Sequence, residues 1–197
     1  MSNFKVIGDI GETLKDLLKD DTHWKDITKP DITLKSPKEI KDQGENVNTI
    51  SIFLYKIVEN MHFKNKELQK IDYTTLQYPP MALDLMYLLT PYGSDPTQEK
   101  YMLGKVMQIF YDNSILTGSV LHGSLKGTDE EIKLIFNPLS LDDLNKIWST
   151  FQETGYRLSI SYLVTPLMID SIREMSVRRV VSTETGQYYK ISKKQEL

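Results

Sequence analysis

Two glycines of the sequence, Gly118 and Gly123, have the separation found in loops that cradle the phosphates of a nucleotide. In such a loop a lysine follows the second glycine and contacts the β and γ phosphates, and the next residue binds the metal ion. Here Ser124 and Leu125 occupy those two positions. A glycine-rich surface loop is therefore the favoured interpretation. A nucleotide-dependent enzyme that uses the segment Gly118–Gly127 remains an alternative.

The three histidines do not form a metal site by local spacing. His23, His62 and His122 lie far apart, and none has a histidine or carboxylate three or four residues further along an expected helix. Ser124 beside His122 suggests a nucleophile and its base, but the Gly-x-Ser-x-Gly turn of many hydrolases is missing. The chain has no cysteine, which excludes a thiol nucleophile and cysteine-bound zinc. We expect no catalytic residue, no cofactor and no metal.

Asp84 is the charged residue inside an otherwise apolar run, Met81–Thr90. An unpaired buried charge is very costly, so this carboxylate must have a partner or face water. One interpretation is a general acid or base. The favoured interpretation is a partner for an arginine or lysine, in the same subunit or across a boundary between subunits, which makes Asp84 a candidate interface residue.

The charge is distributed unevenly along the chain, whose 24 Lys+Arg and 27 Asp+Glu give a net charge of −3. This balance argues against a nucleic-acid-binding protein, and no apolar run approaches the length of a membrane span. Residues 1–172 are acidic on balance, whereas residues 173–197 carry six basic and three acidic side chains. The C-terminal segment is therefore expected to be an arm or a solubilising tail. Because arginine and tyrosine are enriched in interfaces, its candidate contact residues are Arg178, Arg179, Tyr188 and Tyr189.

Three segments have apolar residues at the three- and four-residue spacing of amphipathic helices. The first lies within Phe4–Leu18. The second starts at Asp95, a capping residue that is followed by proline, and is expected to reach about Asn113. The third starts at Ser140 and ends before Gly155. These helices must position whatever site the chain contains.

Strands are expected where β-branched and aromatic residues concentrate between turn signals. Asn48–Val58 and Met81–Thr90 are the clearest, and the second is expected to be buried on both faces. Met61–Gln77 is expected to be a polar loop. Pro166 predicts an edge position or a bend in the last strand. Further strands are expected at Asp31–Lys35, Glu131–Phe136 and Arg157–Ile169.

These elements predict an α/β (α+β) fold with a mixed, mostly antiparallel sheet packed by helices. The helices that start at Asp95 and Ser140 can both cover one face of the sheet, which gives a two-layer sandwich. A chain of 197 residues has the length of one domain. We expect a folded domain over residues 1–172 and a basic arm or tail over residues 173–197.

Five sequence blocks follow one another in an order that is typical of one protein family. They are Ile50–Tyr55, Pro79–Tyr92, Leu103–Gln108, Asn137–Leu144 with Ile147-Trp148, and Tyr156–Tyr162. In this succession, over about residues 1–172, the chain resembles the N-terminal-domain family of cap proteins from contractile injection systems. These systems are phage-tail-like particles related to virulence-cassette and antifeeding-prophage particles.

The resemblance implies a structural protein with a tail-terminator-like fold and no enzymatic activity. Members of this family form a six-fold ring that closes the end of the tube and sheath away from the baseplate. The implied partners are further copies of the chain, the inner tube or a tube-terminator protein, and the sheath protein, with no membrane and no nucleic acid. The resemblance also implies assembly in the cytoplasm and later residence in a released particle. The rival interpretations are the nucleotide-dependent enzyme and a small soluble binding module that uses the basic tail.

Overall fold

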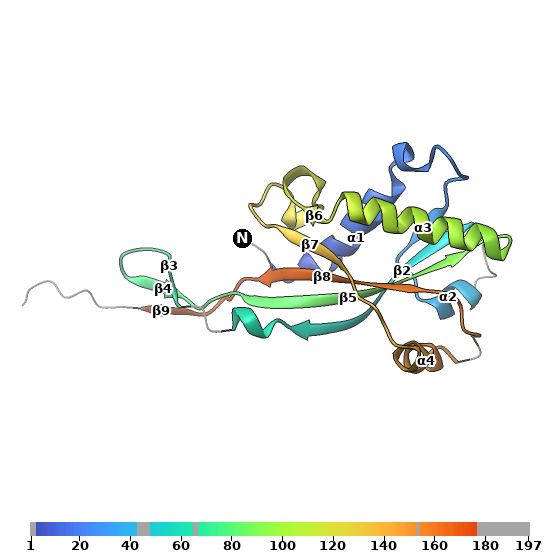
Figure 1. The fold of residues 1–197 in the computed structure, drawn as a ribbon. Coiled ribbons are helices and arrows are strands. Elements are labelled where there is room, and N and C mark those ends of the chain that lie inside the picture. The colour runs from blue at the N-terminus through green and yellow to red at the C-terminus, as the bar shows by residue number, and fades with distance from the viewer. Residues whose placement is uncertain (1–2, 43–47, 65–66, 153, 177–197) are drawn as a thin grey trace, which may run out of the picture.

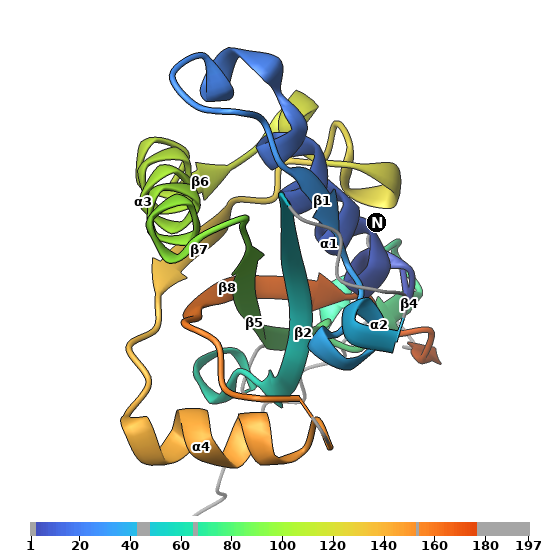
Figure 2. The same ribbon diagram turned by 90° about the vertical axis from the view of Figure 1, so that its right-hand side faces the viewer.

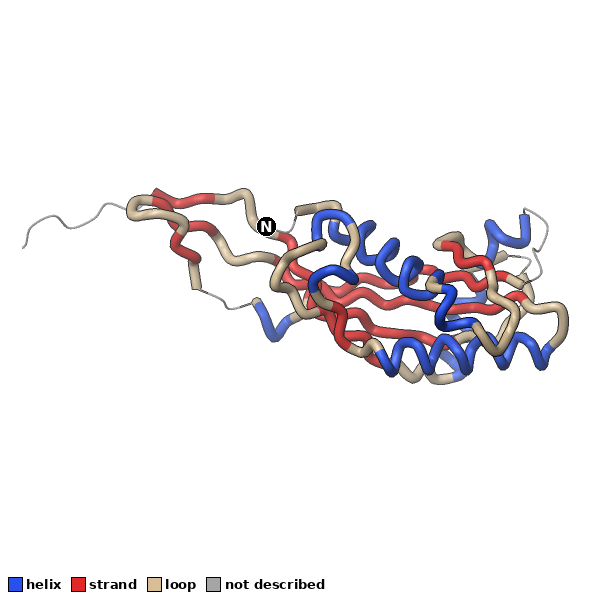
Figure 3. Tube along the Cα trace, turned by 90° about the horizontal axis from the view of Figure 1, so that it is seen from above, coloured by secondary structure: helices blue, strands red, loops and turns tan. Residues whose placement is uncertain are grey.

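A six-stranded sheet forms the centre of the protein, and a three-stranded sheet projects from one end of it (Figure 1, Figure 3). The computed structural model describes residues 3–42, 48–64, 67–152 and 154–176. The strand order is β1-β2-β5-β8-β7-β6 in the central sheet and β3-β4-β9 in the small one. β1 is parallel to β2, and the other neighbouring strands are antiparallel. The mixed, mostly antiparallel sheet predicted from the sequence is confirmed.

Three long strands make up most of the central sheet. They are β2 (Thr49–Glu59), β5 (Met81–Tyr92) and β8 (Ile160–Ile169). Shorter strands flank them: β1 (Asp31–Thr33), β7 (Ile132–Phe136) and β6 (Ile115–Leu116). The sequence therefore located these strands correctly, apart from short shifts of their ends and the missed pair Ile115–Leu116.

Helices α1 (Val6–Lys19) and α3 (Pro96–Asp112) cover one face of the central sheet (Figure 2). Their apolar stripes meet side chains that alternate along the strands, and the burial of this apolar surface stabilises the fold. The helices contribute Val6, Ile10, Leu14, Leu18, Met102, Val106, Ile109 and Phe110 to this core. The three long strands contribute Ile50, Ile52, Leu83, Leu85, Tyr87, Leu89, Tyr162, Val164 and Leu167.

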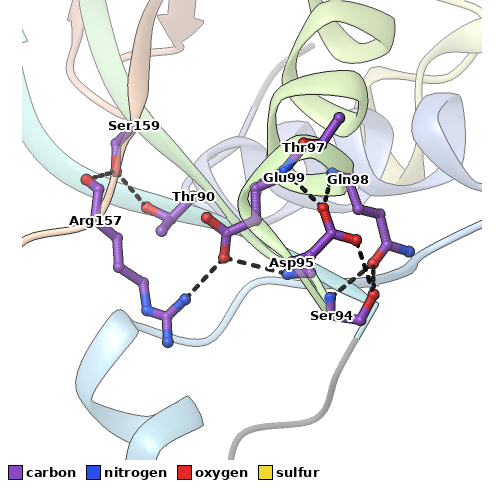
Figure 4. Close-up of polar contacts among 9 residues, drawn as sticks. Thr90, Ser94, Asp95, Thr97, Gln98, Glu99, Arg157 and Ser159 are labelled. Atoms are coloured by element: carbon purple, nitrogen blue, oxygen red, sulfur yellow. Dashed lines mark hydrogen bonds and ion pairs between the residues drawn. The ribbon is translucent and has the colours of Figure 1, made fainter.

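The start of α3 is capped by Asp95, as the sequence predicted. Its carboxylate accepts hydrogen bonds from the backbone N–H groups of Gln98 at 3.0 Å and Thr97 at 2.8 Å (Figure 4). These two bonds lower the pKa of Asp95 below its ordinary value. The side chain of Gln98 accepts from the N–H of Ser94 at 2.6 Å, so the return bond of the capping box reaches one residue further back than usual.

The helix that begins after Ser140, α4 (Leu141–Ser149), lies on the opposite face of the sheet from α1 and α3 (Figure 2). Phe53, which alternates with the core residue Ile52 along β2, packs with its ring centre 5.5 Å from that of Phe151. The prediction that the helices starting at Asp95 and Ser140 share one face is therefore wrong. Because β2 carries apolar side chains on both faces, each face needs its own cover.

The segment Met61–Gln77, which the sequence predicted to be a polar loop, contains regular structure. It includes a turn of 3₁₀ helix (Met61–Phe63) and the strands β3 (Gln69–Lys70) and β4 (Thr75–Gln77). The short helix α2 (Pro37–Asp42) is likewise missed by the sequence patterns. Strands of two or three residues are too short to produce a recognisable alternation.

β8 is not the last strand, because β9 (Glu174–Ser176) follows it and pairs with β4. Nor is β8 an edge strand, since it lies between β5 and β7. Pro166 instead follows Thr165, the last residue of β8 that pairs with β7, so its missing N–H breaks no bond of that ladder. The edge interpretation of Pro166 is therefore wrong.

Candidate functional site

The small sheet belongs to an arm, which we define as residues 67–78 and 171–176, that extends the molecule beyond the central sheet (Figure 1, Figure 3). The root of the arm is fixed by contacts between its two segments. The N–H of Tyr78 donates to the carbonyl of Arg173 at 3.1 Å, and the Arg173 guanidinium lies 4.2 Å from the centre of the Tyr78 ring. The side chain of Gln77 donates to the carbonyl of Ser171. These specific contacts hold the two segments together, so the arm is a folded part of the structure.

The turn between β3 and β4 is closed by Asp72, whose carboxylate accepts from the N–H and hydroxyl of Thr74 at 2.7 and 3.0 Å. This aspartate turn is the sequence signal that would have revealed the hairpin inside the expected loop. Beside the turn, Ile71 and Tyr73 are exposed, and Ile172 at the root is 98% exposed. Exposed apolar side chains at both ends of a projecting element make the arm a candidate interaction surface.

Four of the predicted contact residues, Arg178, Arg179, Tyr188 and Tyr189, lie outside the described residues. Their segment follows directly on Ser176, the last residue of β9. The predicted division at residue 172 falls in the connection between β8 and β9, and the chain after it first adds β9 to the arm. The role of these four residues in contacts with partners stays a prediction.

Asp84 is partly buried and is satisfied by neutral groups. Its Oδ1 atom accepts hydrogen bonds from the side-chain amide of Asn60 at 2.9 Å and from the hydroxyl of Thr165. Asn60 is anchored in turn by its N–H, which donates to the carbonyl of Ala82 at 2.8 Å. Among the described residues, Asp84 is therefore held by Asn60 and Thr165 and not by the arginine or lysine that the sequence favoured. Hydrogen bonds to neutral donors satisfy the carboxylate without a cation. A contact across subunits stays untested.

The glycine-rich segment Gly118–Gly127 lies at the surface, as the sequence predicted, and is anchored to α1. Leu121 and Leu125 are buried in the core. The N–H and hydroxyl of Ser124 donate to the carboxylate of Asp9 at 2.8 and 2.5 Å, and the N–H of His122 donates to the hydroxyl of Thr13 at 2.9 Å. This connection is thus a structural clamp between α1 and the strands that follow.

The same contacts argue against phosphate binding and against nucleophilic catalysis at this segment. The Asp9 carboxylate occupies the position in front of the Ser124 N–H where an anion would have to lie, and it would repel a phosphate. The Ser124 hydroxyl donates to Asp9, while the ring Nδ1 of His122 faces Asp16 at 3.2 Å. Serine and histidine are therefore engaged with different carboxylates and not with each other.

The pKa of Asp9 is below its ordinary value of 3.8. Desolvation of the carboxyl by itself would raise this pKa, but the hydrogen bonds from Ser124, together with the charges of His122 and Lys5, outweigh it. A carboxyl with a lowered folded-state pKa stabilises the fold above its ordinary pKa and loses that contribution as the pH falls through the folded value.

We expect Asp9→Asn to lower the free energy of unfolding by about 1 kcal/mol at pH 7, because a charge-assisted hydrogen bond becomes a neutral one in a partly screened site. The difference from the wild type should be full above about pH 5 and should be lost as the pH falls through the folded pKa, which is lower than the ordinary value of 3.8. Urea unfolding at several pH values measures it. Asp16→Asn, on the same helix and also beside the clamp, is the matched control and should change stability by less than about 0.5 kcal/mol.

At the end of the sheet away from the arm, a half-buried ion pair joins α3 to the chain before β8 (Figure 4). The guanidinium of Arg157 donates to the Glu99 carboxylate at 2.9 Å and lies 4.8 Å from the centre of the Tyr92 ring. Next to it, the hydroxyls of Thr90 and Ser159 are 2.9 Å apart. Arg157 lies in one of the five family-like sequence blocks, and its contacts give it a structural role at this end.

The described part of the chain contains no cluster of three or more histidine or acidic side chains that could hold a metal ion. Among the same residues, no helix is long and apolar enough to cross a membrane. The geometry therefore supports an interaction surface centred on the arm and its exposed strand edges more strongly than a chemical site.

Two solved structures share this fold over nearly the whole chain. One, described as an extracellular contractile injection system PVC sheath/tube terminator in the extended state, matches with a TM-score of 0.66 and 21% identity. The other, described as the anti-feeding prophage cap (AFP tube terminating cap), matches with a TM-score of 0.64 and 19% identity.

The chain spans about two thirds of the length of these two structures. The matches cover 98% and 94% of this chain but 67% and 62% of theirs. At such identities the likeness shows the fold, and it confirms the tail-terminator-like architecture expected from the sequence. No curated protein sequence matches the chain closely. A family model described as the Pvc16 N-terminal domain matches residues 9–183, which is most of the chain. This protein therefore belongs to the Pvc16 N-terminal domain family.

Proposed function

We propose that this chain is a structural cap, or terminator, protein of a phage-tail-like contractile injection system. In this role it closes the baseplate-distal end of the tube and sheath as a ring, most simply a hexamer. The observation that carries the proposal is the likeness of fold, over 98% of the chain, to a structure described as a sheath/tube terminator. Membership in the Pvc16 N-terminal domain family supports it independently of that structure.

The physical features of the chain suit a ring subunit. A closed ring of identical subunits needs two different surfaces on each copy, because the contacts run head to tail. The arm supplies a projecting surface with exposed Ile71, Tyr73 and Ile172, and the central sheet supplies open strand edges. The clamp formed by Asp9 and Ser124 gives the glycine-rich segment a structural role, which supports a protein without enzymatic activity.

The partners that follow from this proposal are other copies of the chain, the inner tube or a tube-terminator protein, and the sheath. Nucleic acid and membrane are not among them. Assembly would take place in the cytoplasm, and the protein would then remain part of a particle that can be released. Asp84, with its Asn60 and Thr165 partners, lies on the face of the sheet away from α1 and α3 and is retained as a candidate contact residue.

Mass photometry of the purified protein, alone and mixed with its tube partner, tests the proposal. We expect a closed ring with a mass near six times the 22.8 kDa of the chain, at least when the tube is present. The protein should also be found in purified particles. Nucleotide should leave the melting temperature unchanged, since Asp9 occupies the front of the glycine-rich segment. A protein that stays monomeric under every condition and is absent from particles would contradict the cap.

A further inference from the structure

One outer edge of the central sheet is largely open. β1 pairs with β2 only over Thr49–Ser51, whereas β5 pairs with β2 along its whole length as far as Glu59. Among the described residues, no strand pairs with the outer edge of β2 beyond Ser51. The last four residues of the strand, Lys56–Glu59, are all exposed. We call these four residues the β2 edge; they lie at the end of the sheet from which the arm projects (Figure 1).

The β2 edge has two β-branched apolar residues at its centre, which suit contact with an added strand. Ile57 and Val58 are 46% and 37% exposed, and both are β-branched. Natural edge strands are usually blunted by charges, proline or a bulge, because their unpaired N–H and C=O groups attract other strands. Here Lys56 and Glu59 stand at the two ends of the edge, Lys56 directly after a register shift in the pairing with β5, and Glu59 pairs with Lys64 at 3.3 Å. The centre of the edge is left to the two apolar residues.

A segment able to fill such an edge begins at the arm. In the pairing of β9 with β4, Glu174 lies opposite Gln77 near the body and Ser176 lies opposite Thr75 further out. The chain therefore passes Ser176 in a direction away from its own central sheet (Figure 1). Residues 177–197 can span at most about 70 Å, and they contain two β-prone runs, Val177–Val181 and Gln187–Ser192.

We propose that the β2 edge of one copy accepts a strand from residues 177–197 of a neighbouring copy. The inference rests on the proposed ring, and it names the two surfaces that meet in it. Backbone hydrogen bonds supply the affinity, and side chains on the two faces of the added strand lie beside Ile57 and Val58, which face opposite sides of the sheet. The added strand and the edge that accepts it lie at different places on the chain, as head-to-tail closure of a ring requires. The chain would have to reverse its direction to reach its own edge.

The absence of cysteine from the chain makes disulfide mapping a direct test. Ile57→Cys protein is mixed with a series of proteins that each carry one cysteine between residues 177 and 192. Because a disulfide requires Cα atoms within about 7 Å, a cross-link reports direct neighbours. We expect mixed dimers on non-reducing gels, at alternating positions of the series, since alternate residues of a strand face the same side.

Ile115→Cys is the matched control, because Ile115 is a similarly exposed isoleucine, at 54%, on the opposite edge of the same sheet. Cross-linking at Ile57 should exceed that at Ile115 at least fivefold. Equal cross-linking at the two edges, or no alternation along the series, would overturn the inference. A protein that carries both cysteines and forms the disulfide only within one chain would also overturn the inference.

A second pair of variants separates this inference from the proposed function. Ile57→Lys places a charge on the edge opposite a basic segment, so we expect the protein concentration needed for ring assembly to rise about threefold or more. Ile115→Lys should leave it unchanged. Both variants should fold, since each side chain is about half exposed. If rings form equally well from both, the inference fails and the cap stands. If the wild type forms no ring and is absent from particles, the cap itself fails.

Discussion

A chain truncated after Ser176 should fold with the stability of the full chain but fail to hold the end of the tube and sheath. Every described strand and helix of the core and the arm lies before this point, so no described hydrogen bond or buried side chain is removed. The truncation removes Arg178, Arg179, Tyr188 and Tyr189, the predicted contact residues. We expect sheaths that detach and tubes of uneven length.

Electron microscopy of particles from the truncated strain measures the effect, and urea unfolding of the purified protein checks the fold. A chain in which residues 177–197 are replaced by a Gly/Ser linker of equal length is the matched control, because it keeps the length and loses the β-prone and basic side chains. It should behave like the truncation. Uniformly capped particles from either variant would leave residues 177–197 as a solubilising tail.

Gly123→Ala should lower the free energy of unfolding by about 2–4 kcal/mol. Gly123 has φ +57°, and a Cβ atom there would lie 2.3 Å from Oδ1 of Asp9. An alanine therefore carries the strain of a left-handed backbone and also displaces the Asp9 side chain from Ser124. Gly118→Ala is the control, because Gly118 has φ +58° but nothing within 4 Å of its Cβ position. It should cost about 1–2 kcal/mol from backbone strain alone.

A double-mutant cycle identifies the clamp as the cause of the larger effect. In the pair Gly123→Ala and Asp9→Ala, the second change removes the carboxylate that the new methyl group meets. The cost of the double variant should therefore fall below the sum of the two single costs by at least about 1 kcal/mol. Equal costs at the two glycines, or strict additivity with Asp9, would contradict the clamp. Urea unfolding at pH 7 supplies all of these values.

Elements whose signals are local were predictable from the sequence. The cap at Asp95 and the proline after it place the start of α3, because capping involves only neighbouring residues. Spacing of three and four places α1, and a continuous apolar run places β5. The departure of the glycine-rich segment from a phosphate loop was also visible in the sequence, since Ser124 and Leu125 stand where that chemistry needs other residues.

Features that depend on contacts between distant residues were not predictable in the same way. The partners of Asp84 are 24 and 81 positions away, at Asn60 and Thr165, and the partner of Ser124 is 115 positions away at Asp9. A polar side chain can be satisfied by a charge, an amide or a hydroxyl, and its own position does not say which. For this reason the sequence did not reveal that Asn60 and Thr165 hold Asp84 within the chain, and a charged partner across subunits stays a prediction.

The sequence by itself determined the long elements, the fold class and the family resemblance, because periodic and local patterns extend over many residues of the chain. Only the tertiary structure decided that α4 covers the face of the sheet opposite α1 and α3, and that β9 joins β4 to build the arm. The hydrophobic effect favours the burial of an apolar face but is non-directional. Which helix covers each face of the sheet therefore depends on the geometry of the whole chain. Strands as short as β3, β4 and β9 have too few residues for a pattern, and they form because pairing across the arm satisfies their backbone groups.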